Sequence, residues 1–238
     1  MIPPEQETKA DSDLTIEGRL RAVHDRINVA CLNANRQPDS VNLLAVSKTK
    51  PVSDVEQAIQ AGQVHFGENY LQDALEKIEM IGHRAVWHFI GAIQSNKTRA
   101  IAENFDWVHT VSSLKVARRL NEQRPESLAP LKIFLQINID NDAAKSGLKP
   151  PEIEALKQAF DQFERLELVG LMTLPTQREG LQGQREPFQA LAELQRDQLP
   201  STSELSMGMS GDLEAAIMEG ATWVRIGTDI FGARQKND

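Results

Sequence analysis

The feature that most limits the fold of this sequence is a regular alternation of short apolar segments with longer amphipathic ones. Eight segments have the length and the β-branched or aromatic content of strands. Strands that alternate with helices are typical of a parallel sheet, because each return to the same end of the sheet needs a crossover. In chain order the strand candidates are residues 41–47, 64–67, 86–90, 107–111, 132–138, 166–172, 204–207 and 223–226.

Amphipathic segments lie before and between these strands. Apolar residues recur at spacings of three and four from Ile16 to Cys31, which predicts a helix ahead of the first strand. The segment Ser53-Asp-Val-Glu56 has the pattern of a capping box that begins the next helix, and Gly62 is placed to end it. Further helices are expected at about 69–80, 95–104, 113–123, 151–163, 182–198 and 212–219.

This organisation predicts a single (β/α)8 barrel with one extra N-terminal helix. Eight strand-helix units occupy roughly 200 residues without a Gly/Ser-rich linker, which suits one barrel domain. We expect the barrel to span residues 15–234, after a polar tail at 1–14. A doubly wound open sheet is the alternative, and the number of strands favours the barrel. The long loop expected at 175–184 is either a lid or a connection without a function of its own.

Composition excludes several classes of function. The net charge of -8 argues against a nucleic acid or an anionic membrane as partner, because binding to either normally requires a basic patch. No apolar run approaches the ~20 residues of a membrane span. The single cysteine, Cys31, lies on an apolar helix stripe and fits a reducing compartment. The histidines lack HxH and HExxH spacing, so no metal centre is expected. We therefore expect a cytoplasmic protein, and a monomer because no apolar patch is visible.

Lys48 is the candidate with the most specific chemistry. It ends the first apolar run just before a helix start, so its amine is expected at the carboxyl end of the first strand. Barrels of this class keep their active sites at that end. A lysine there can form a Schiff base with an aldehyde if burial lowers its pKa, and an ordinary solvated lysine is the alternative.

Two segments near the last two strands are suited to hold phosphate. Ser206-Met-Gly-Met-Ser210-Gly-Asp212 precedes a helix, where free amides and hydroxyls attract anions, and a plain turn with Ser210 as N-cap is the alternative. After the eighth strand, Gly227 permits a close backbone approach and Thr228 adds a hydroxyl donor. Because strand eight neighbours strand one in a closed barrel, this phosphate site is expected beside Lys48.

Three more polar residues belong to strands or strand ends. Arg225 either points outward into a salt bridge or points inward as a permanent cation that can only donate hydrogen bonds. Asn69 either caps the next helix or donates to a ligand oxygen. His88 is expected to pack or to hydrogen-bond rather than to ligate a metal.

Together these residues resemble the pyridoxal phosphate homeostasis proteins. The resemblance covers nearly the whole chain and implies a barrel similar to the N-terminal domain of bacterial alanine racemase. The matching segments, in order, are Leu44-Ala-Val-Ser-Lys48-Thr-Lys-Pro51, Phe66-Gly-Glu-Asn-Tyr70, Trp87-His-Phe-Ile-Gly91, Gln94-Ser-Asn-Lys97, Lys145-Ser-Gly147, Leu205-Ser-Met-Gly-Met-Ser210, Val224-Arg-Ile-Gly-Thr228 and Ile230-Phe-Gly232.

The resemblance also implies a role for each candidate. Lys48 would form the Schiff base with pyridoxal 5'-phosphate (PLP), and Arg225 would face the pyridine nitrogen. Asn69 and His88 would line the pocket. The phosphate would be held by Ser210, Gly227, Thr228 and the amide of Met209.

The expected function is intracellular PLP homeostasis rather than catalysis, because the resemblance implies a family without robust activity. A racemase needs two opposed proton-transfer groups, and Tyr70 is the only tyrosine. A cation at the ring nitrogen also makes the ring a weaker electron sink. The alternatives are a PLP-dependent enzyme such as an amino-acid racemase, and a cofactor-free Schiff-base aldolase. Candidate recipients of the cofactor are PLP-dependent apoenzymes or regulatory proteins; neither a nucleic acid nor a membrane is expected.

Overall fold

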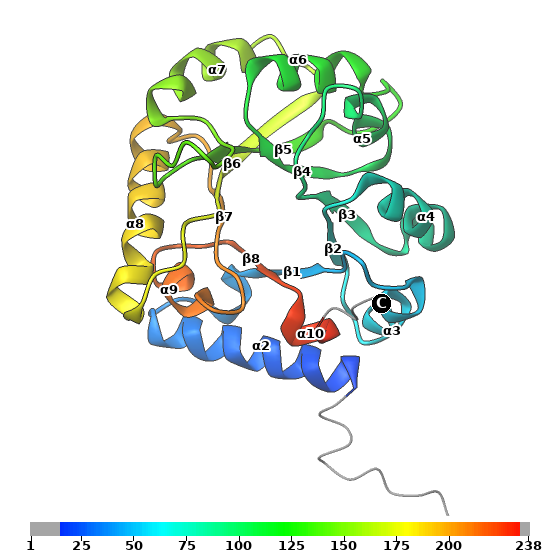
Figure 1. The fold of residues 1–238 in the computed structure, drawn as a ribbon, viewed down its shortest axis with the longest axis vertical. Helices are drawn as coiled ribbons and strands as arrows, with labels where there is room; N and C mark the ends of the chain where they lie inside the picture. Colours follow the sequence, from blue (N-terminus) through cyan, green and yellow to red (C-terminus); the bar gives the residue numbers. More distant parts are fainter. Residues whose placement is uncertain (1–14, 234–238) are drawn as a thin grey trace, which may run out of the picture.

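A computed structural model describes residues 15–233, in which eight parallel strands close into a barrel in chain order (Figure 1). β1 pairs with both β2 and β8, so the predicted (β/α)8 barrel is confirmed and the doubly wound alternative is wrong. The predicted tail at 1–14 lies outside the described residues. The strands are β1 (Asn42–Val46), β2 (His65–Glu68), β3 (Val86–Phe89), β4 (Trp107–Val111), β5 (Leu131–Ile137), β6 (Leu166–Thr173), β7 (Glu204–Ser206) and β8 (Trp223–Ile226).

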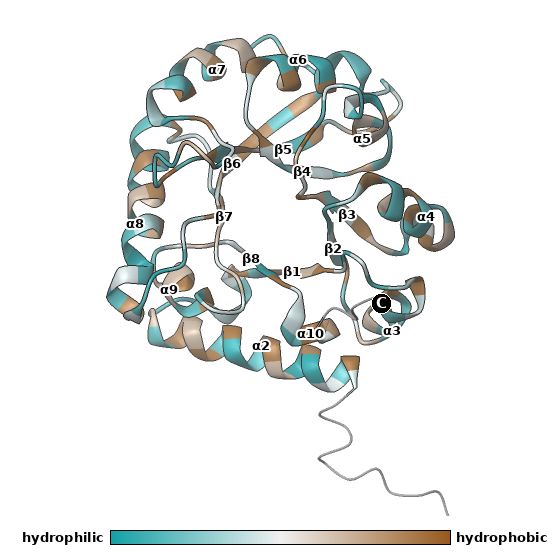
Figure 2. Cartoon of the chain, in the orientation of Figure 1, coloured by the Kyte–Doolittle hydropathy of each residue, from teal (hydrophilic) through white to brown (hydrophobic). Residues whose placement is uncertain are grey.

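Helices form a ring outside the barrel (Figure 1). Along the longer helices, such as α2 and α8, hydrophobic and hydrophilic residues alternate, as expected for elements with one buried face (Figure 2). No helix within residues 15–233 combines the length and apolar character needed to cross a membrane. The α-helices are α2 (Ile16–Asn33), α3 (Val52–Gln60), α4 (Leu71–Ile81), α5 (Thr98–Asn104), α6 (Leu114–Gln123), α7 (Ile153–Phe160), α8 (Gly180–Gln198), α9 (Leu213–Met218) and α10 (Thr228–Phe231), and the 3₁₀ turns are Pro38–Ser40, Gly82–Arg84 and Pro150–Glu152.

The extra helix α2 supports the barrel beside its last two helices. It lies against α9 and α10, and its residue Cys31 is fully buried, as its place on the apolar stripe predicts. Arg26 pairs with Glu214 of α9 at 2.5 Å and with Asp229 of α10 at 3.3 Å. These contacts fix the helices that follow the loops at the ends of β7 and β8.

Some helix boundaries differ from the sequence prediction. The N-cap of α3 is Pro51, whose φ of -67° suits a helix entrance, so the predicted capping box at Ser53 is wrong. Gly62 ends that helix as predicted, with a φ of +93°. Helix α8 begins at Gly180, which removes half of the expected 175–184 loop. The single turn α10 was not expected, because so short a helix has no apolar period.

The apolar core has two layers. The larger layer lies between the helices and the strands, and a smaller one fills the barrel interior. In the interior the rings of Trp107 and Trp223 are 5.1 Å apart, and Phe134 stacks on Trp107 at 5.9 Å. These large rings close the lower part of the barrel, so a ligand can enter only at the rim.

Candidate functional site

A cavity of about 270 Å³ opens at the carboxyl ends of the strands. This volume is slightly below the ~300–1,000 Å³ that is usual for small-molecule cavities, so the cavity suits a ligand no larger than one small ring compound. Seven of the eight residues predicted from the sequence line it, and His88 is the exception. The lining residues are Val46, Lys48, Asn69, Ile90, Met172, Leu174, Met209, Ser210, Gly211, Arg225, Gly227 and Thr228.

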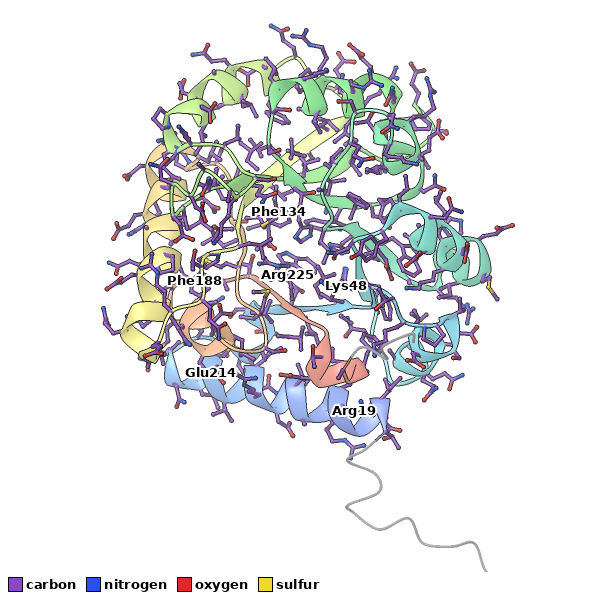
Figure 3. The ribbon with its side chains drawn as sticks, in the orientation of Figure 1. Arg19, Lys48, Phe134, Phe188, Glu214 and Arg225 are labelled. Carbon is purple, nitrogen blue, oxygen red and sulfur yellow. The ribbon has the colours of Figure 1, made fainter. Side chains whose placement is uncertain are left out.

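Lys48 reaches this cavity from the turn that follows β1. Figure 3 shows it on the inner side of the barrel, near Arg225. Its neighbour Thr49 has a φ of +62°, a left-handed conformation that costs a non-glycine residue about 1–2 kcal/mol. Lys50 secures the same turn, since its Nζ donates to the carbonyls of Phe231 at 2.8 Å and Ala233 at 3.0 Å. The chain therefore holds Lys48 in a strained but anchored turn.

A buried ion pair lies behind this turn and was missed from the sequence. Lys77 of α4 is 2.6 Å from Oε1 of Glu68, and the Ser47 hydroxyl donates to the same oxygen at 2.6 Å. Lys77 also donates to the Ser47 carbonyl at 2.7 Å, which ties the ends of β1 and β2 to the helix. Burial raises the pKa of Glu68 and Lys77 opposes the rise, while Oε2 of Glu68 is buried without a partner. The available signal was a lysine on the apolar stripe of α4.

Arg225 points into the barrel, so the outward salt-bridge alternative is wrong. The side chain is 5% exposed, and it donates from Nη1 to the Ser206 hydroxyl and from Nη2 to the Thr173 carbonyl, both at 2.8 Å. Burial lowers the pKa of Arg225 to about 10, which still leaves it cationic at neutral pH. The cavity wall thus contains a permanent cation held by neutral partners.

The loops after β7 and β8 bring the predicted phosphate-binding residues together. Within residues 15–233, the hydroxyls of Ser210 and Thr228 make no hydrogen bond, and both line the cavity. A Cβ on Gly227 would lie 3.1 Å from the Val46 carbonyl oxygen, so glycine lets this loop pass close to β1. These two hydroxyls are therefore available to an anion.

Asp212 changes two details of that prediction. It is the N-cap residue of α9, so the alternative in which Ser210 is the N-cap is wrong. The amide of Met209, expected to hold phosphate, donates instead to Oδ1 of Asp212 at 2.6 Å. An acidic side chain that reaches back to an amide three residues earlier is the arrangement found in a capping box. A bound anion can use the Met209 amide only if Asp212 gives way.

Asn69 lies at the cavity and does not cap a helix. The N-cap residue of α4 is Tyr70, and Oδ1 of Asn69 is buried without a hydrogen-bond partner. Leaving such an acceptor unpaired costs about 1–3 kcal/mol. The arrangement favours a ligand that donates to Asn69.

His88 lies below the cavity, so the expectation that it lines the pocket is corrected. It is the third residue of β3 and fully buried, with ring nitrogens 3.0 Å from Nδ1 of His65 and 2.9 Å from Nε2 of His109. Because His88 points into the barrel interior from the middle of its strand, it does not reach the rim. Among residues 15–233, no three histidine, cysteine, aspartate or glutamate side chains are grouped to hold a metal ion.

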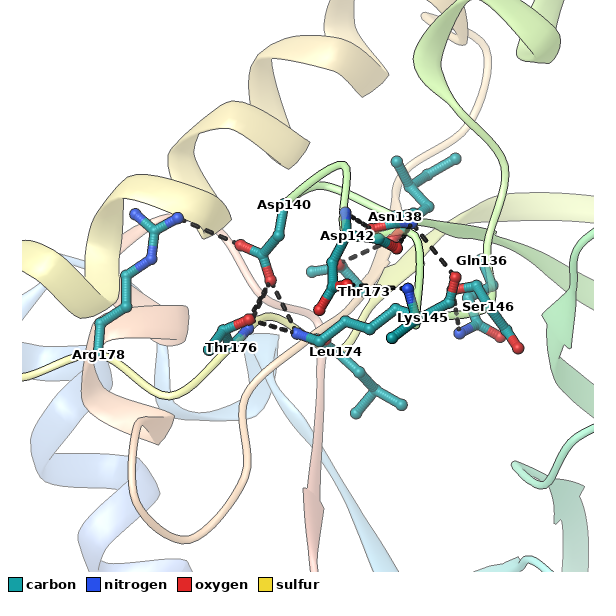
Figure 4. A network of polar contacts seen from close by, with 12 residues as sticks. Gln136, Asn138, Asp140, Asp142, Lys145, Ser146, Thr173, Leu174, Thr176 and Arg178 are labelled. Atoms are coloured by element: carbon teal, nitrogen blue, oxygen red, sulfur yellow. Dashed lines mark hydrogen bonds and ion pairs between the residues drawn. The ribbon is translucent and has the colours of Figure 1, made fainter.

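A second cavity of about 390 Å³ adjoins the first on the β4–β5 side. Beside it a polar network, which we call the rim network, connects the loops after β5 and β6 through Asp140, Lys145, Thr176 and Arg178 (Figure 4). Asp140 accepts from Lys145 at 2.8 Å, from Arg178 at 3.2 Å and from the amide of Thr176 at 2.6 Å. Burial alone would raise the pKa of Asp140, but the bonds from Lys145 and Thr176 lower it to about 2. The cations on this side are neutralised by the protein itself.

Comparisons with known proteins agree with this geometry. The alanine racemase N-terminal domain family matches residues 20–235. Pyridoxal phosphate homeostasis proteins of Pseudomonas aeruginosa and Escherichia coli K12 are 52% and 46% identical to this chain; both alignments cover 92% of it, and 96% and 97% of the relatives. The structure of PipY from Synechococcus elongatus with PLP bound has a TM-score of 0.79 and 34% identity, covering 92% of this chain and all of PipY. An alanine racemase of Corynebacterium glutamicum, at 18% identity and a TM-score of 0.65, shares the fold over 92% of this chain and 62% of its own.

Proposed function

Since this chain belongs to the pyridoxal phosphate homeostasis proteins of the alanine racemase N-terminal domain family, we propose that it binds PLP and takes part in PLP homeostasis. In this proposal the protein holds the cofactor as a Schiff base on Lys48 and releases it intact. The observation that carries the proposal is the meeting of Lys48, Arg225 and the hydroxyls of Ser210 and Thr228 in one small cavity.

The chemistry of these residues matches the parts of PLP. When bound, the cofactor supplies an aldehyde, which condenses with a primary amine with loss of water. Lys48 provides the amine. Ser210, Gly227 and Thr228 bind the phosphate. Arg225 donates to the ring nitrogen, whose lone pair is the acceptor that a donor-only side chain requires.

The same cavity favours holding the cofactor over using it in catalysis. Racemisation needs a proton-transfer group on each face of the substrate. Among the described lining residues, Lys48 and Arg225 are the only titratable side chains, and Arg225 stays charged. Tyr70 is 50% exposed and does not line the cavity. The permanent charge of Arg225 also disfavours a protonated ring nitrogen, which weakens the ring as an electron sink.

Reduction with borohydride tests this function directly. We expect protein mixed with PLP to be yellow, to lose that colour on reduction, and to yield a peptide modified at Lys48 by mass spectrometry. Modification at another side chain, or none in excess cofactor, would refute the proposed attachment. A protein that stays colourless with PLP and still processes an aldehyde substrate would favour the aldolase alternative.

A second measurement separates the carrier from an enzyme. We expect the PLP-loaded protein to leave L-alanine unchanged in chiral analysis after overnight incubation. Sustained conversion to the D-isomer, proportional to protein concentration, would favour the racemase alternative.

A further inference from the structure

A continuous chain of hydrogen bonds crosses the barrel interior below the proposed PLP site. Nδ1 of His65 is 3.0 Å from Nε2 of His88, and Nδ1 of His88 is 2.9 Å from Nε2 of His109. Nδ1 of His109 is 2.8 Å from the Ser206 hydroxyl, which accepts from Arg225 at 2.8 Å. We call these residues, from His65 to Ser206, the interior relay. It connects four strands to the side chain that lines the cavity.

The relay is enclosed by aromatic rings. His88 stacks on Trp107 at 5.1 Å with an interplanar angle of 10°, and His109 lies 4.4 Å from Phe134. His88, His109 and Ser206 are each fully buried. Buried polar groups without partners are costly, so these side chains depend on one another for their hydrogen bonds.

Arg225 sets the direction of every bond in the relay. A guanidinium can only donate, so the Ser206 oxygen accepts and its own proton must find an acceptor. The acceptor is Nδ1 of His109, which leaves the His109 proton on Nε2 to donate to His88. The same reasoning gives His88 a proton on Nε2, donated to Nδ1 of His65. The three imidazoles are thus neutral and share one tautomer.

The electrostatic surroundings keep the inner part of the relay uncharged. Burial lowers the pKa of His88 and His109 well below the ordinary value. The charge of Arg225 lowers the pKa of His109 further, and that of Lys132 adds to the effect at His88. A second positive charge beside Arg225 is therefore strongly disfavoured.

His65 is the end of the relay nearest to solvent. It is the first residue of β2, at the amino end of the barrel, and it is only half-buried. Its ring lies 4.9 Å from that of Trp223. Burial lowers the pKa of His65, with Asp106 opposing and Lys132 reinforcing the shift. A proton from solvent can reach the relay here.

We propose that the interior relay positions Arg225 for the ligand, and that protonation of the relay weakens ligand binding. An imidazolium has a proton on both nitrogens, so a charged histidine in the relay turns a donor toward another donor. When the charge lies on His109, the broken bond is the one to the Ser206 hydroxyl, and the new charge repels Arg225. The effect on PLP rests on the proposed function, whereas the order of protons along the relay does not.

Nitrogen-15 NMR of the full chain, recorded before PLP is added, tests the relay itself. His24→Asn and His83→Asn variants identify the signals of the two histidines outside it. We expect His88 and His109 to be neutral at neutral pH, with the proton on Nε2, and to take up a proton only at a pH well below 6.5. A proton on Nδ1 of His109 at neutral pH, or an imidazolium there, overturns the inference.

A matched pair of variants tests the effect on the ligand. Ser206→Thr keeps the hydroxyl, and Ser206→Val has the shape of threonine without the hydroxyl. In PLP titrations followed by absorbance, we expect Ser206→Val to bind about tenfold more weakly than Ser206→Thr at neutral pH. The ratio should fall toward one only at the lower pH at which NMR shows the relay to be protonated.

The outcomes distinguish this inference from the proposed function. Equal affinities of the two variants at every pH, with PLP still bound, overturn the positioning role and leave the function intact. Absence of PLP binding in the unaltered chain overturns the function and the ligand effect together, and the NMR result then decides the relay alone. Circular dichroism of both variants confirms that they are folded.

Discussion

The two sides of the barrel rim contain similar charged residues but treat them differently. On the β5–β6 side, Asp140 pairs with Lys145 and Arg178, so the charges are satisfied within the protein (Figure 4). On the β8–β1 side, Arg225 has no carboxylate at ion-pair distance within residues 15–233 and is held by the neutral Ser206 and Thr173. A cation at a strand end is therefore a poor guide to a ligand site by itself. A better criterion is whether a carboxylate of the protein itself pairs with that cation.

The largest expected effect comes from exchanging one lysine on each side for arginine. We expect Lys48→Arg to abolish the borohydride-trapped PLP adduct, because a guanidinium does not condense with the aldehyde at neutral pH. Lys145→Arg should leave the yield of adduct unchanged, since its partner Asp140 accepts from either cation. Mass spectrometry of the reduced protein measures both. Loss of the adduct in Lys145→Arg would break the distinction between the two sides.

The next effect concerns the buried Lys77–Glu68 ion pair behind the turn that contains Lys48. Lys77→Met leaves the buried Glu68 carboxylate without its cation, and we expect a loss of about 3–5 kcal/mol in the free energy of unfolding. Adding Glu68→Gln should recover most of that loss, because the uncompensated charge is then gone. Urea denaturation of the two variants measures the difference. A double variant no more stable than Lys77→Met would show that packing, and not charge, dominates there.

A smaller effect on PLP affinity is expected when one arginine on each side of the rim is exchanged for lysine. Arg225→Lys loses the planar fork that reaches Ser206 and Thr173 together, so we expect PLP affinity to fall about tenfold. Arg178→Lys, at the rim network, should change that affinity less than twofold. Absorbance titration gives both values. Equal losses would mean that the network contributes to the ligand site as much as Arg225 does.

The smallest effect is expected from the rim network in acid. The pKa of Asp140 is about 2 in the folded protein and 3.8 ordinarily, so its stabilising effect is complete above pH 4 and is lost as the pH falls toward 2. We expect Asp140→Asn to lower the free energy of unfolding by about 1 kcal/mol at neutral pH. It should also flatten the pH dependence below pH 4, with PLP affinity unchanged. Thermal unfolding at several pH values provides the comparison.

The barrel could be predicted from the sequence because its signals are local. The ends of all eight strands lie within one residue of the expected segments, since each apolar run is bounded by turn residues. The capping box at Ser53 failed because Pro51, two residues earlier, already provides a helix entrance. Helix α10 is a single turn and leaves no periodic pattern to recognise.

The site could be predicted only in part, because its remaining features join distant segments. Lys48, Arg225 and the two loops follow from strand order, since strand ends meet at one rim. The alignment of His65, His88 and His109 depends on how neighbouring strands are staggered, which the sequence does not state. Three histidines within three consecutive strand segments were nevertheless a visible signal. The Glu68–Lys77 pair likewise depends on how α4 lies against β2.

The bond between the Met209 amide and Asp212 has a consequence for the proposed release of PLP. A backbone amide that binds an anion loses its hydrogen-bond partner when the anion leaves. Here the Asp212 carboxylate accepts from the Met209 amide, so this amide has a partner within the protein when no anion is bound. We therefore expect PLP to bind and leave repeatedly without a lasting unpaired amide at this loop.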